Sequence, residues 1–134
     1  MKSIYKRILL IEDDVDDQHL FCEVMKHFDP VEIVILSNGF EAIEAIRGHT
    51  KPDIIFLDLN MPVMNGKEFI TTVSKNHLYE GPIVILSTSS FEEDIYDCQK
   101  LGIRDFLTKP SNFSELLQMI ASVLIEEIEV QHPA

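Results

Sequence analysis

The sequence predicts an open α/β fold, a doubly wound parallel sheet of five strands with helices on both faces. Short apolar runs without polar alternation are typical of strands buried on both faces, and stretches with helical spacing separate these runs. Strand and helix alternate five times, which indicates a parallel sheet with strand order 2-1-3-4-5. The 134 residues suffice for one domain but not for the eight units of a closed barrel.

The predicted strands are four continuous apolar runs and one shorter segment. Isoleucine, valine and leucine dominate the runs, and β-branched residues favour a buried pleated strand. The runs cover residues 8–11, 33–36, 54–57 and 83–86, and the shorter candidate covers residues 105–108. We expect one domain over residues 1–134, with its core from about residue 6 to residue 128 and a polar C-terminal tail after a fraying last helix.

The predicted helices follow from apolar spacing and from residues that begin or end helices. One helical face after the first strand is formed by Leu20, Phe21, Val24, Met25 and Phe28. The second helix is expected to begin at Asn38-Gly39 and to end at Gly48. The third carries Phe69, Ile70 and Val73.

The last two helices have clearer beginnings. Residues 90–93 predict a capping box that starts at Ser90, and Gly102 ends that helix after Ile95, Cys98 and Leu101. Ser111 or Asn112 caps the final helix. Its apolar stripe comprises Phe113, Leu116, Leu117, Ile120, Val123, Leu124 and Ile128.

The composition argues against several classes of function. A formal net charge of −12 repels phosphate backbones, so we expect no nucleic-acid binding and favour partners with basic patches. No apolar stretch approaches the roughly 20 residues of a membrane helix, and the first apolar run is too short for a signal peptide. Cys22 and Cys98 fall in predicted helices and are expected to be free thiols. These features predict a soluble cytoplasmic protein.

Polar residues stand directly after four of the predicted strands. The carboxyl ends of parallel strands meet at one sheet edge, where ligands bind in open α/β sheets. The relevant residues are Glu12-Asp13-Asp14, Asp58, Ser87-Thr88 and Lys109-Pro110. Neighbouring strands are about 4.8 Å apart, so Asp13 and Asp58 are close enough to share a cation. A lysine has the reach to span the roughly 10 Å from the fifth strand to the third.

This set of residues predicts phosphoryl chemistry that depends on Mg²⁺. Clustered carboxylates repel one another, so without a cation at least one should have a raised pKa. Mg²⁺ relieves the repulsion and takes carboxylate and phosphate oxygens as ligands. A lysine and a hydroxyl on the other side neutralise and orient phosphate oxygens, and an aspartate carboxylate can accept a phosphoryl group. Asp58 is the candidate acceptor.

Four stretches in this order resemble the receiver family of response regulators, the chemotaxis-regulator-like proteins. They are residues 8–14, 52–62 with Asn65-Gly66, 82–88 and 102–110. The resemblance implies a (βα)5 flavodoxin-like fold and a single-domain two-component response regulator. Such a protein is a signalling phosphoacceptor rather than an enzyme on other substrates, and it takes its phosphoryl group from a sensor histidine kinase or a phosphotransfer protein. The long connection at residues 76–81 is similar to small receivers of bacteriophytochrome-type kinases.

The resemblance also implies a role for each matching acid. Asp58 is the phosphoacceptor. Asp13, Asp58 and the backbone carbonyl of Asn60 bind Mg²⁺, and Glu12 acts through a water molecule. Glu12 departs from the commoner aspartate by one methylene, which leaves its distance to the metal open. Asn60 also flanks the path of the water that hydrolyses the acyl phosphate.

The remaining implied roles belong to the fourth and fifth strands. Ser87 takes the hydroxyl position, where threonine is commoner, and Thr88 and Ser89 tune the lifetime of the phosphoryl group. Lys109 pairs with the phosphoryl group, and the bond from Lys109 to Pro110 is expected to be cis.

The resemblance further implies a switch and an output surface. Phe106 stands at an aromatic switch position and, with Ser87, would couple the site to an output face. That face comprises residues 90–101, 105–108 and 111–128, and it is expected to bind a downstream protein target and to permit homodimer formation. Core packing alone also explains Phe106 and the stripe of the last helix.

Other interpretations remain beside this one. The acids at 12–14 could cap the following helix, although Asp58 opposite them favours a metal site. A haloacid-dehalogenase-type phosphohydrolase also uses an aspartate nucleophile. That family requires a second acid two residues after the nucleophile, with both on the first strand, whereas this chain has Asn60 there, after the third strand. A degenerate, purely binding receiver would lack an acid, the hydroxyl or the lysine, and none is missing. The sequence does not distinguish an activating receiver from a phosphate sink.

Overall fold

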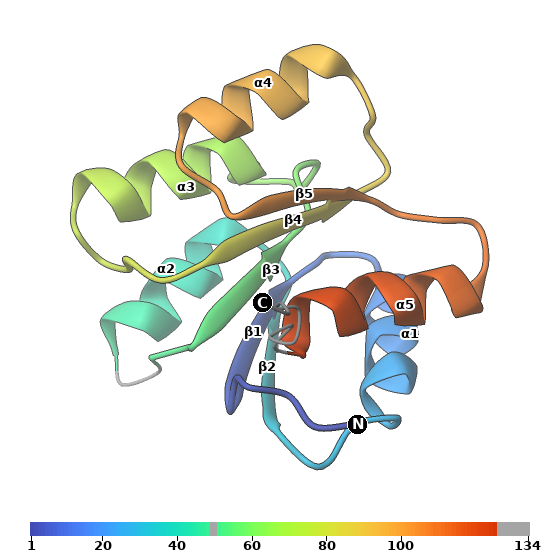
Figure 1. The fold of residues 1–134 in the computed structure, drawn as a ribbon. Helices are drawn as coiled ribbons and strands as arrows, with labels where there is room; N and C mark the ends of the chain where they lie inside the picture. Colours follow the sequence, from blue (N-terminus) through green and yellow to red (C-terminus); the bar gives the residue numbers. More distant parts are fainter. Residues whose placement is uncertain (49–50, 126–134) are drawn as a thin grey trace, which may run out of the picture.

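The computed structural model describes residues 1–48 and 51–125, in which strands and helices alternate (Figure 1). The parallel strands are β1 (Arg7–Ile11), β2 (Glu32–Leu36), β3 (Ile54–Leu57), β4 (Ile83–Ser87) and β5 (Asp105–Thr108). The helices are α1 (Val15–Met25), α2 (Gly39–Arg47), α3 (Gly66–Lys75), α4 (Glu92–Lys100) and α5 (Phe113–Leu124). The sheet order is β2-β1-β3-β4-β5, which confirms the predicted fold class and order.

The helices form two layers on opposite faces of the sheet. Figure 1 shows α1 and α5 on one face and α2, α3 and α4 on the other. Successive residues of each central strand point to opposite faces, so that Ile54 and Phe56 of β3 pack under α1 and α5 while Ile55 and Leu57 pack under the other helices. Both faces are covered, which explains why the strands lack polar alternation.

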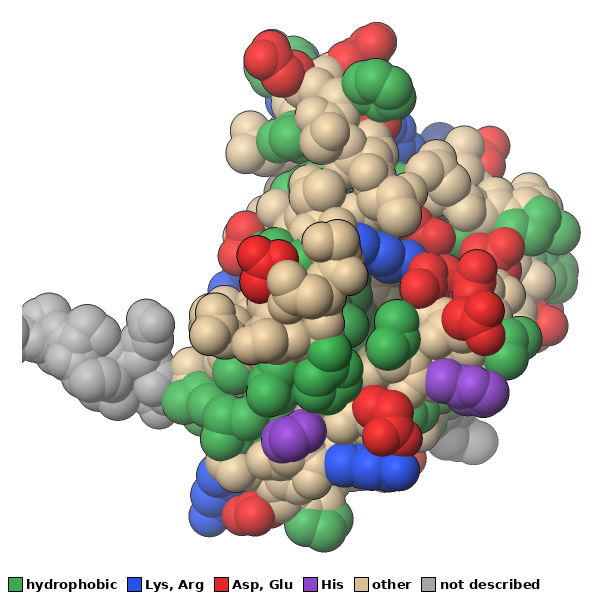
Figure 2. Space-filling view, turned by 90° about the vertical axis from the view of Figure 1, so that its right-hand side faces the viewer, with side chains coloured by type: hydrophobic (Ala, Val, Ile, Leu, Met, Phe, Trp, Pro, Cys, Tyr) green, Lys and Arg blue, Asp and Glu red, His purple; other side chains and the backbone are tan. Residues whose placement is uncertain are grey.

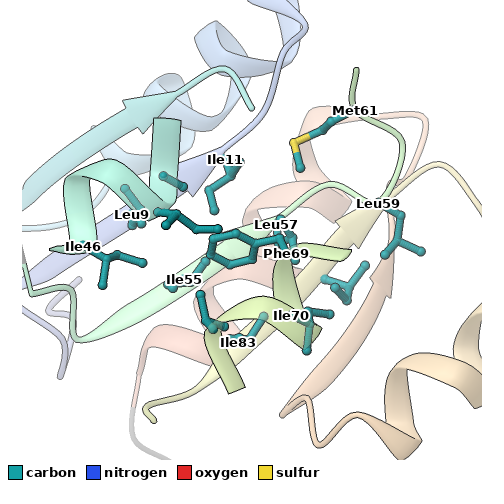
Figure 3. Close-up of a cluster of buried hydrophobic side chains, with 14 of the residues drawn as sticks. Leu9, Ile11, Ile46, Ile55, Leu57, Leu59, Met61, Phe69, Ile70 and Ile83 are labelled. Carbon is teal, nitrogen blue, oxygen red and sulfur yellow. The ribbon is translucent and has the colours of Figure 1, made fainter. Parts of the chain in front are cut away.

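The core on the α2–α4 side reaches the carboxyl edge of the sheet. Phe69 of α3 lies at the centre of the labelled side chains in Figure 3, against Ile55 and Leu57 of β3. The same cluster includes Leu59 and Met61 from the segment after β3. The loop that follows Asp58 is therefore anchored by its own apolar side chains.

Most predicted helix boundaries agree with the structure. The side chains of Asn38 and Asn112 cap α2 and α5, as predicted. The start of α3 was not predicted; its N-cap is Asn65, which forms a reciprocal capping box with Glu68. Gly48 is the C-cap of α2. On α5, the apolar stripe is anchored in the core by the buried residues Leu116, Ile120 and Leu124. The predicted extension of this helix to residue 128 and the predicted tail lie outside the described residues.

Two details of the helix predictions are wrong. The N-cap of α4 is Phe91, whose side chain makes no capping bond, so Ser90 lies one position too early to cap the helix. The Ser89 hydroxyl oxygen instead accepts a hydrogen bond from the Phe91 amide at 3.4 Å. Leu20, which the apolar spacing predicts on the inward face of α1, is 43% exposed. It flanks the buried Phe21 rather than pointing into the sheet.

Other sequence expectations have a direct structural counterpart. Cys22 and Cys98 are both free, and Cys98 is buried, where burial raises the pKa of its thiol. Among the described helices, none combines the length and the apolar character that crossing a bilayer requires.

Candidate functional site

Three carboxylates meet at the carboxyl edge of the sheet. Ile11 of β1 pairs with Leu57 of β3, and the Asp58 amide donates to the Ile11 carbonyl at 3.1 Å. This register brings Glu12, Asp13 and Asp58 together, with one carboxylate oxygen from each within 4.8 Å of the others. Asp13 is exposed, whereas Glu12 and Asp58 are 3% and 8% exposed. The predicted meeting of these acids is confirmed.

Glu12 is the acid whose protonation the site perturbs. Its Oε1 accepts from the Lys109 ammonium at 2.7 Å and its Oε2 accepts from the Asp14 amide at 3.2 Å. Burial raises the pKa of Glu12 to about 7, because the cost of burying the charge exceeds what Lys109 restores. The raised pKa expected in the cluster falls on Glu12, but its main cause is burial, and repulsion from Asp58 contributes less.

Asp14 does not belong to the carboxylate cluster. It is the N-cap of α1, and its Oδ1 accepts from the amides of Asp16 and Asp17 at 2.8 and 3.1 Å. The helix-cap interpretation is thus correct for the third acid of the 12–14 run, whereas the first two face Asp58.

Lys109 reaches the acid cluster from the end of β5. Its amide donates to the Ser87 carbonyl at 2.7 Å, and its side chain is 13% exposed. The ammonium donates to Glu12 at 2.7 Å and to Asp17 at 2.8 Å. Burial opposes the charge, but the bonds to Asp17 and Glu12 outweigh it and raise the pKa of Lys109. The lysine is thus held charged, on the α1 side of the cluster.

The predicted cis bond before Pro110 is wrong for this structure. The described residues contain no cis peptide bond, so Lys109 and Pro110 are joined in trans. Trans is the lower-energy isomer of an X-Pro bond by about 0.5–1 kcal/mol, and nothing in the sequence itself required the other.

Ser87 and Ser89 are both buried at the end of β4, whereas Thr88 between them is exposed. The Ser89 amide donates to the Ser87 hydroxyl oxygen at 3.3 Å. The carbonyl of Ser89 accepts from the Thr108 hydroxyl at 3.3 Å. The two buried serines are therefore linked to each other and to β5, which ties the loop after β4 to the neighbouring strand.

Lys67 is a part of this region that the sequence did not indicate. Its ammonium lies 2.7 Å from Asp94 and 2.9 Å from Asp97, and Asp94 also accepts from the Ser89 hydroxyl at 2.7 Å. These contacts raise the pKa of Lys67 and lower that of Asp94. A cavity of about 200 Å³ lies beside these groups, and its lining includes Asn60, Lys67 and Asp94. We call the bonds of Lys67 to Asp94 and Asp97, together with that of Ser89 to Asp94, the α3–α4 clamp.

The turn after Asp58 is shaped by a close backbone contact. The Asn60 amide lies 3.4 Å from Asp58 Oδ1, and the Gly66 amide donates to the Leu59 carbonyl at 2.9 Å. A Cβ atom on Gly66 would lie 2.9 Å from the Asp58 carbonyl oxygen and 2.8 Å from the Leu59 Cα. Only glycine fits this position without a shift of the backbone that carries Asp58.

Phe106 and the predicted output face lie beside this edge. Phe106 is half-buried and packs against the core on the α2–α4 side. Phe91, the N-cap of α4, is 74% exposed, and Tyr96 on the same helix is 60% exposed. Figure 2 views the carboxyl edge, and on it acidic side chains gather beside a basic side chain.

The site suits a hard divalent cation. All three candidate ligand atoms are carboxylate oxygens, and two of the carboxylates are buried and therefore pre-positioned. Oxygen donors of this kind are the ligands of Mg²⁺ and Mn²⁺. A cation here would also stabilise the ionised form of Glu12 and so oppose the rise in its pKa that burial causes.

Comparison with known proteins agrees with the fold. A model of the response regulator receiver domain matches residues 8–121. Response regulator Rcp1 of Synechocystis sp. is 32% identical over 126 residues, which cover 88% of this chain and 86% of Rcp1. A protein-glutamate methylesterase/protein-glutamine glutaminase of Clostridium acetobutylicum is 33% identical over 94% of the chain, but the chain spans only 36% of that enzyme.

Solved structures give the same result. The phosphorylated cyanobacterial phytochrome response regulator RcpA has a TM-score of 0.81 and 34% identity, over 89% of this chain and 91% of RcpA. The Mn²⁺-bound form of Rcp1 also has a TM-score of 0.81, with 32% identity over 96% of this chain and 99% of Rcp1. With its sheet order, its carboxylate edge and these matches, the chain belongs to the response regulator receiver family of two-component signalling proteins.

Proposed function

We propose that Asp58 accepts a phosphoryl group in a reaction that depends on Mg²⁺. The observation that carries the proposal is the placement of a buried Asp58 between two further carboxylates and the strand end that bears Lys109. Asp13, Asp58 and the Asn60 carbonyl would hold the ion, with Glu12 acting through water. When bound, Mg²⁺ supplies positive charge that neutralises phosphoryl oxygens.

The transfer is a displacement at phosphorus. A carboxylate oxygen of Asp58 forms the new O–P bond while the N–P bond of a phosphohistidine breaks, and the histidine nitrogen takes the electron pair. Ser87 donates its hydroxyl to one phosphoryl oxygen and Lys109 donates to another. Hydrolysis ends the signal: the oxygen of a water molecule forms a bond to phosphorus while the bond from Asp58 oxygen to phosphorus breaks. The Asp58 carboxylate keeps the electron pair, and inorganic phosphate leaves with the oxygen and a proton of the water. Asn60, Thr88 and Ser89 tune this self-catalysed hydrolysis.

We further propose how the signal enters and leaves. The donor is a sensor histidine kinase or a phosphotransfer protein, and the likeness to the phytochrome response regulator RcpA supports a phytochrome-type kinase. Residues 1–134 act as one cytoplasmic receiver domain. Phosphorylation shifts a two-state equilibrium in which Phe106 and the output face take part, and this face binds a downstream protein or a second copy. The exposed aromatic side chains of Phe91, at the start of α4, and of Tyr96 on α4 support such contacts.

Intact mass spectrometry tests the phosphoacceptor directly. Purified protein is incubated with acetyl phosphate, with and without Mg²⁺, as wild type and as Asp58→Asn. We expect one labile phosphoryl group on the wild type with Mg²⁺, and none without the ion or in the variant. Asp16→Asn is the matched control, because Asp16 is an exposed aspartate on the nearby α1 helix and should label normally. Labelling of Asp58→Asn, or a wild type that does not bind beryllofluoride in the presence of Mg²⁺, contradicts the proposal.

A further inference from the structure

We infer that Asp17 is a positioning residue that holds Lys109 on the α1 side of the site and thereby weakens the binding of a phosphoryl group at Asp58. The inference rests on the proposed function, because it concerns the same lysine. Asp17 lies in the first turn of α1, three residues after the N-cap. Its own side chain takes no part in capping, and its Oδ2 accepts from the Lys109 ammonium at 2.8 Å.

The Lys109 side chain is enclosed by neighbouring residues as well as bound to two carboxylates. It borders a small cavity of about 50 Å³ between β1, β4, α1 and α5, whose apolar lining includes Leu20, Phe21 and Leu116. With 13% of its side chain exposed, Lys109 has little freedom to leave this position without exchanging its partners. Two of the three ammonium hydrogens are directed to Glu12 and Asp17.

The two acids differ in what happens to them when the site is used. Glu12 belongs to the carboxylate cluster, so the ion would draw its charge toward the metal. Asp17 is outside that cluster and keeps its full attraction for Lys109. A phosphoryl group on Asp58 must compete with Asp17 for the ammonium, and each half-buried ion pair that is lost reduces the net gain. Removing the Asp17 charge should therefore favour the phosphorylated arrangement.

The test is a double-mutant cycle read by calorimetric titration with beryllofluoride in excess Mg²⁺. Asp17→Asn should bind beryllofluoride about threefold to tenfold more tightly than the wild type, with unchanged affinity for Mg²⁺ alone. Asp17→Glu, which keeps the charge, should stay close to the wild type. In a Lys109→Met background, Asp17→Asn should have no effect, because the lysine that it frees is absent.

Asp16→Asn is the matched control, since it removes the same charge from the same helix turn without touching Lys109. An equal gain in Asp16→Asn would show that only the general field matters and would overturn the inference. Weaker binding in Asp17→Asn would mean that Asp17 orients Lys109 productively, which also overturns it. If the wild type binds Mg²⁺ but no beryllofluoride, the proposed function itself fails and the inference fails with it.

Discussion

Replacing Gly66 with alanine tests how closely the phosphoacceptor loop is fitted. Gly66 begins α3 directly after a capping asparagine, and Gly39 begins α2 in the same way after Asn38. A Cβ on Gly66 would meet the Leu59 Cα at 2.8 Å and the Asp58 carbonyl oxygen at 2.9 Å, both backbone atoms. A Cβ on Gly39 would meet only the side chain of Met64, at 3.0 Å and beyond.

The two substitutions should therefore differ sharply in cost. Overpacking against backbone costs about 1–3 kcal/mol, and for a chain of this size 1 kcal/mol corresponds to a fall in Tm of about 4 °C. Gly66→Ala should thus lower Tm by about 4–12 °C. Gly39→Ala should cost less than about 1 kcal/mol, because Met64 can move and alanine favours the helix. The Gly66 variant should also bind beryllofluoride about tenfold more weakly, since the strain falls on Asp58.

Thermal unfolding followed by circular dichroism measures the first difference, and calorimetric titration with Mg²⁺ and beryllofluoride measures the second. Gly39→Ala is the matched control, because Gly39 and Gly66 are both buried glycines at the first position of a helix, and both variants are measured in the same buffer. Equal losses of Tm in Gly66→Ala and Gly39→Ala would refute the reasoning, since they would mean that the backbone contact at Asp58 carries no special cost.

Two further predictions concern charged groups. Because the pKa of Glu12 is about 7 in the fold against 4.5 ordinarily, its contribution to stability is complete below about pH 4.5 and is lost as the pH rises through 7. Urea unfolding without Mg²⁺ should show a loss of about 3 kcal/mol over this range that Glu12→Gln lacks; identical pH profiles would contradict it. Lys67→Met should cost about 1 kcal/mol in urea unfolding, as it leaves Asp94 and Asp97 unpaired, whereas Lys75→Met on the same helix should cost less than about 0.5 kcal/mol. Equal costs would exclude a stabilising role for the α3–α4 clamp.

The fold could be predicted because its signals are local and agree with one another. The apolar runs, the asparagines that begin helices and the alternation of strand and helix all indicate the same sheet, whose order makes the strands before Asp13 and Asp58 neighbours. The meeting of the carboxylates follows from backbone register, which does not depend on side-chain rotamers.

The remaining details depend on side-chain direction, which spacing does not determine. The resemblance predicts that Lys109 pairs with a phosphoryl group at Asp58, but it does not predict that the ammonium contacts Asp17 as well as Glu12. The only hint of the contact between Asp17 and Lys109 in the sequence is that Asp17 lies among other acids in the first turn of α1. The sequence contains no hint of the ion pairs of Lys67, because Asp94 and Asp97 lie on another helix and only the tertiary structure brings them near. The cap of α4 was misplaced by one residue, a common error at helix ends.

The α3–α4 clamp makes the setting of α4 depend on the solution around the protein. Its ion pairs are about one-quarter to two-fifths exposed, so dissolved ions reach them. The Debye length shrinks from about 30 Å at 0.01 M salt to about 8 Å at physiological ionic strength, which weakens such attractions. The ion pairs that join α4 to Lys67 are therefore weaker at high ionic strength than at low ionic strength. The strength of the α3–α4 clamp thus depends on the ionic strength as well as on the residues that form it.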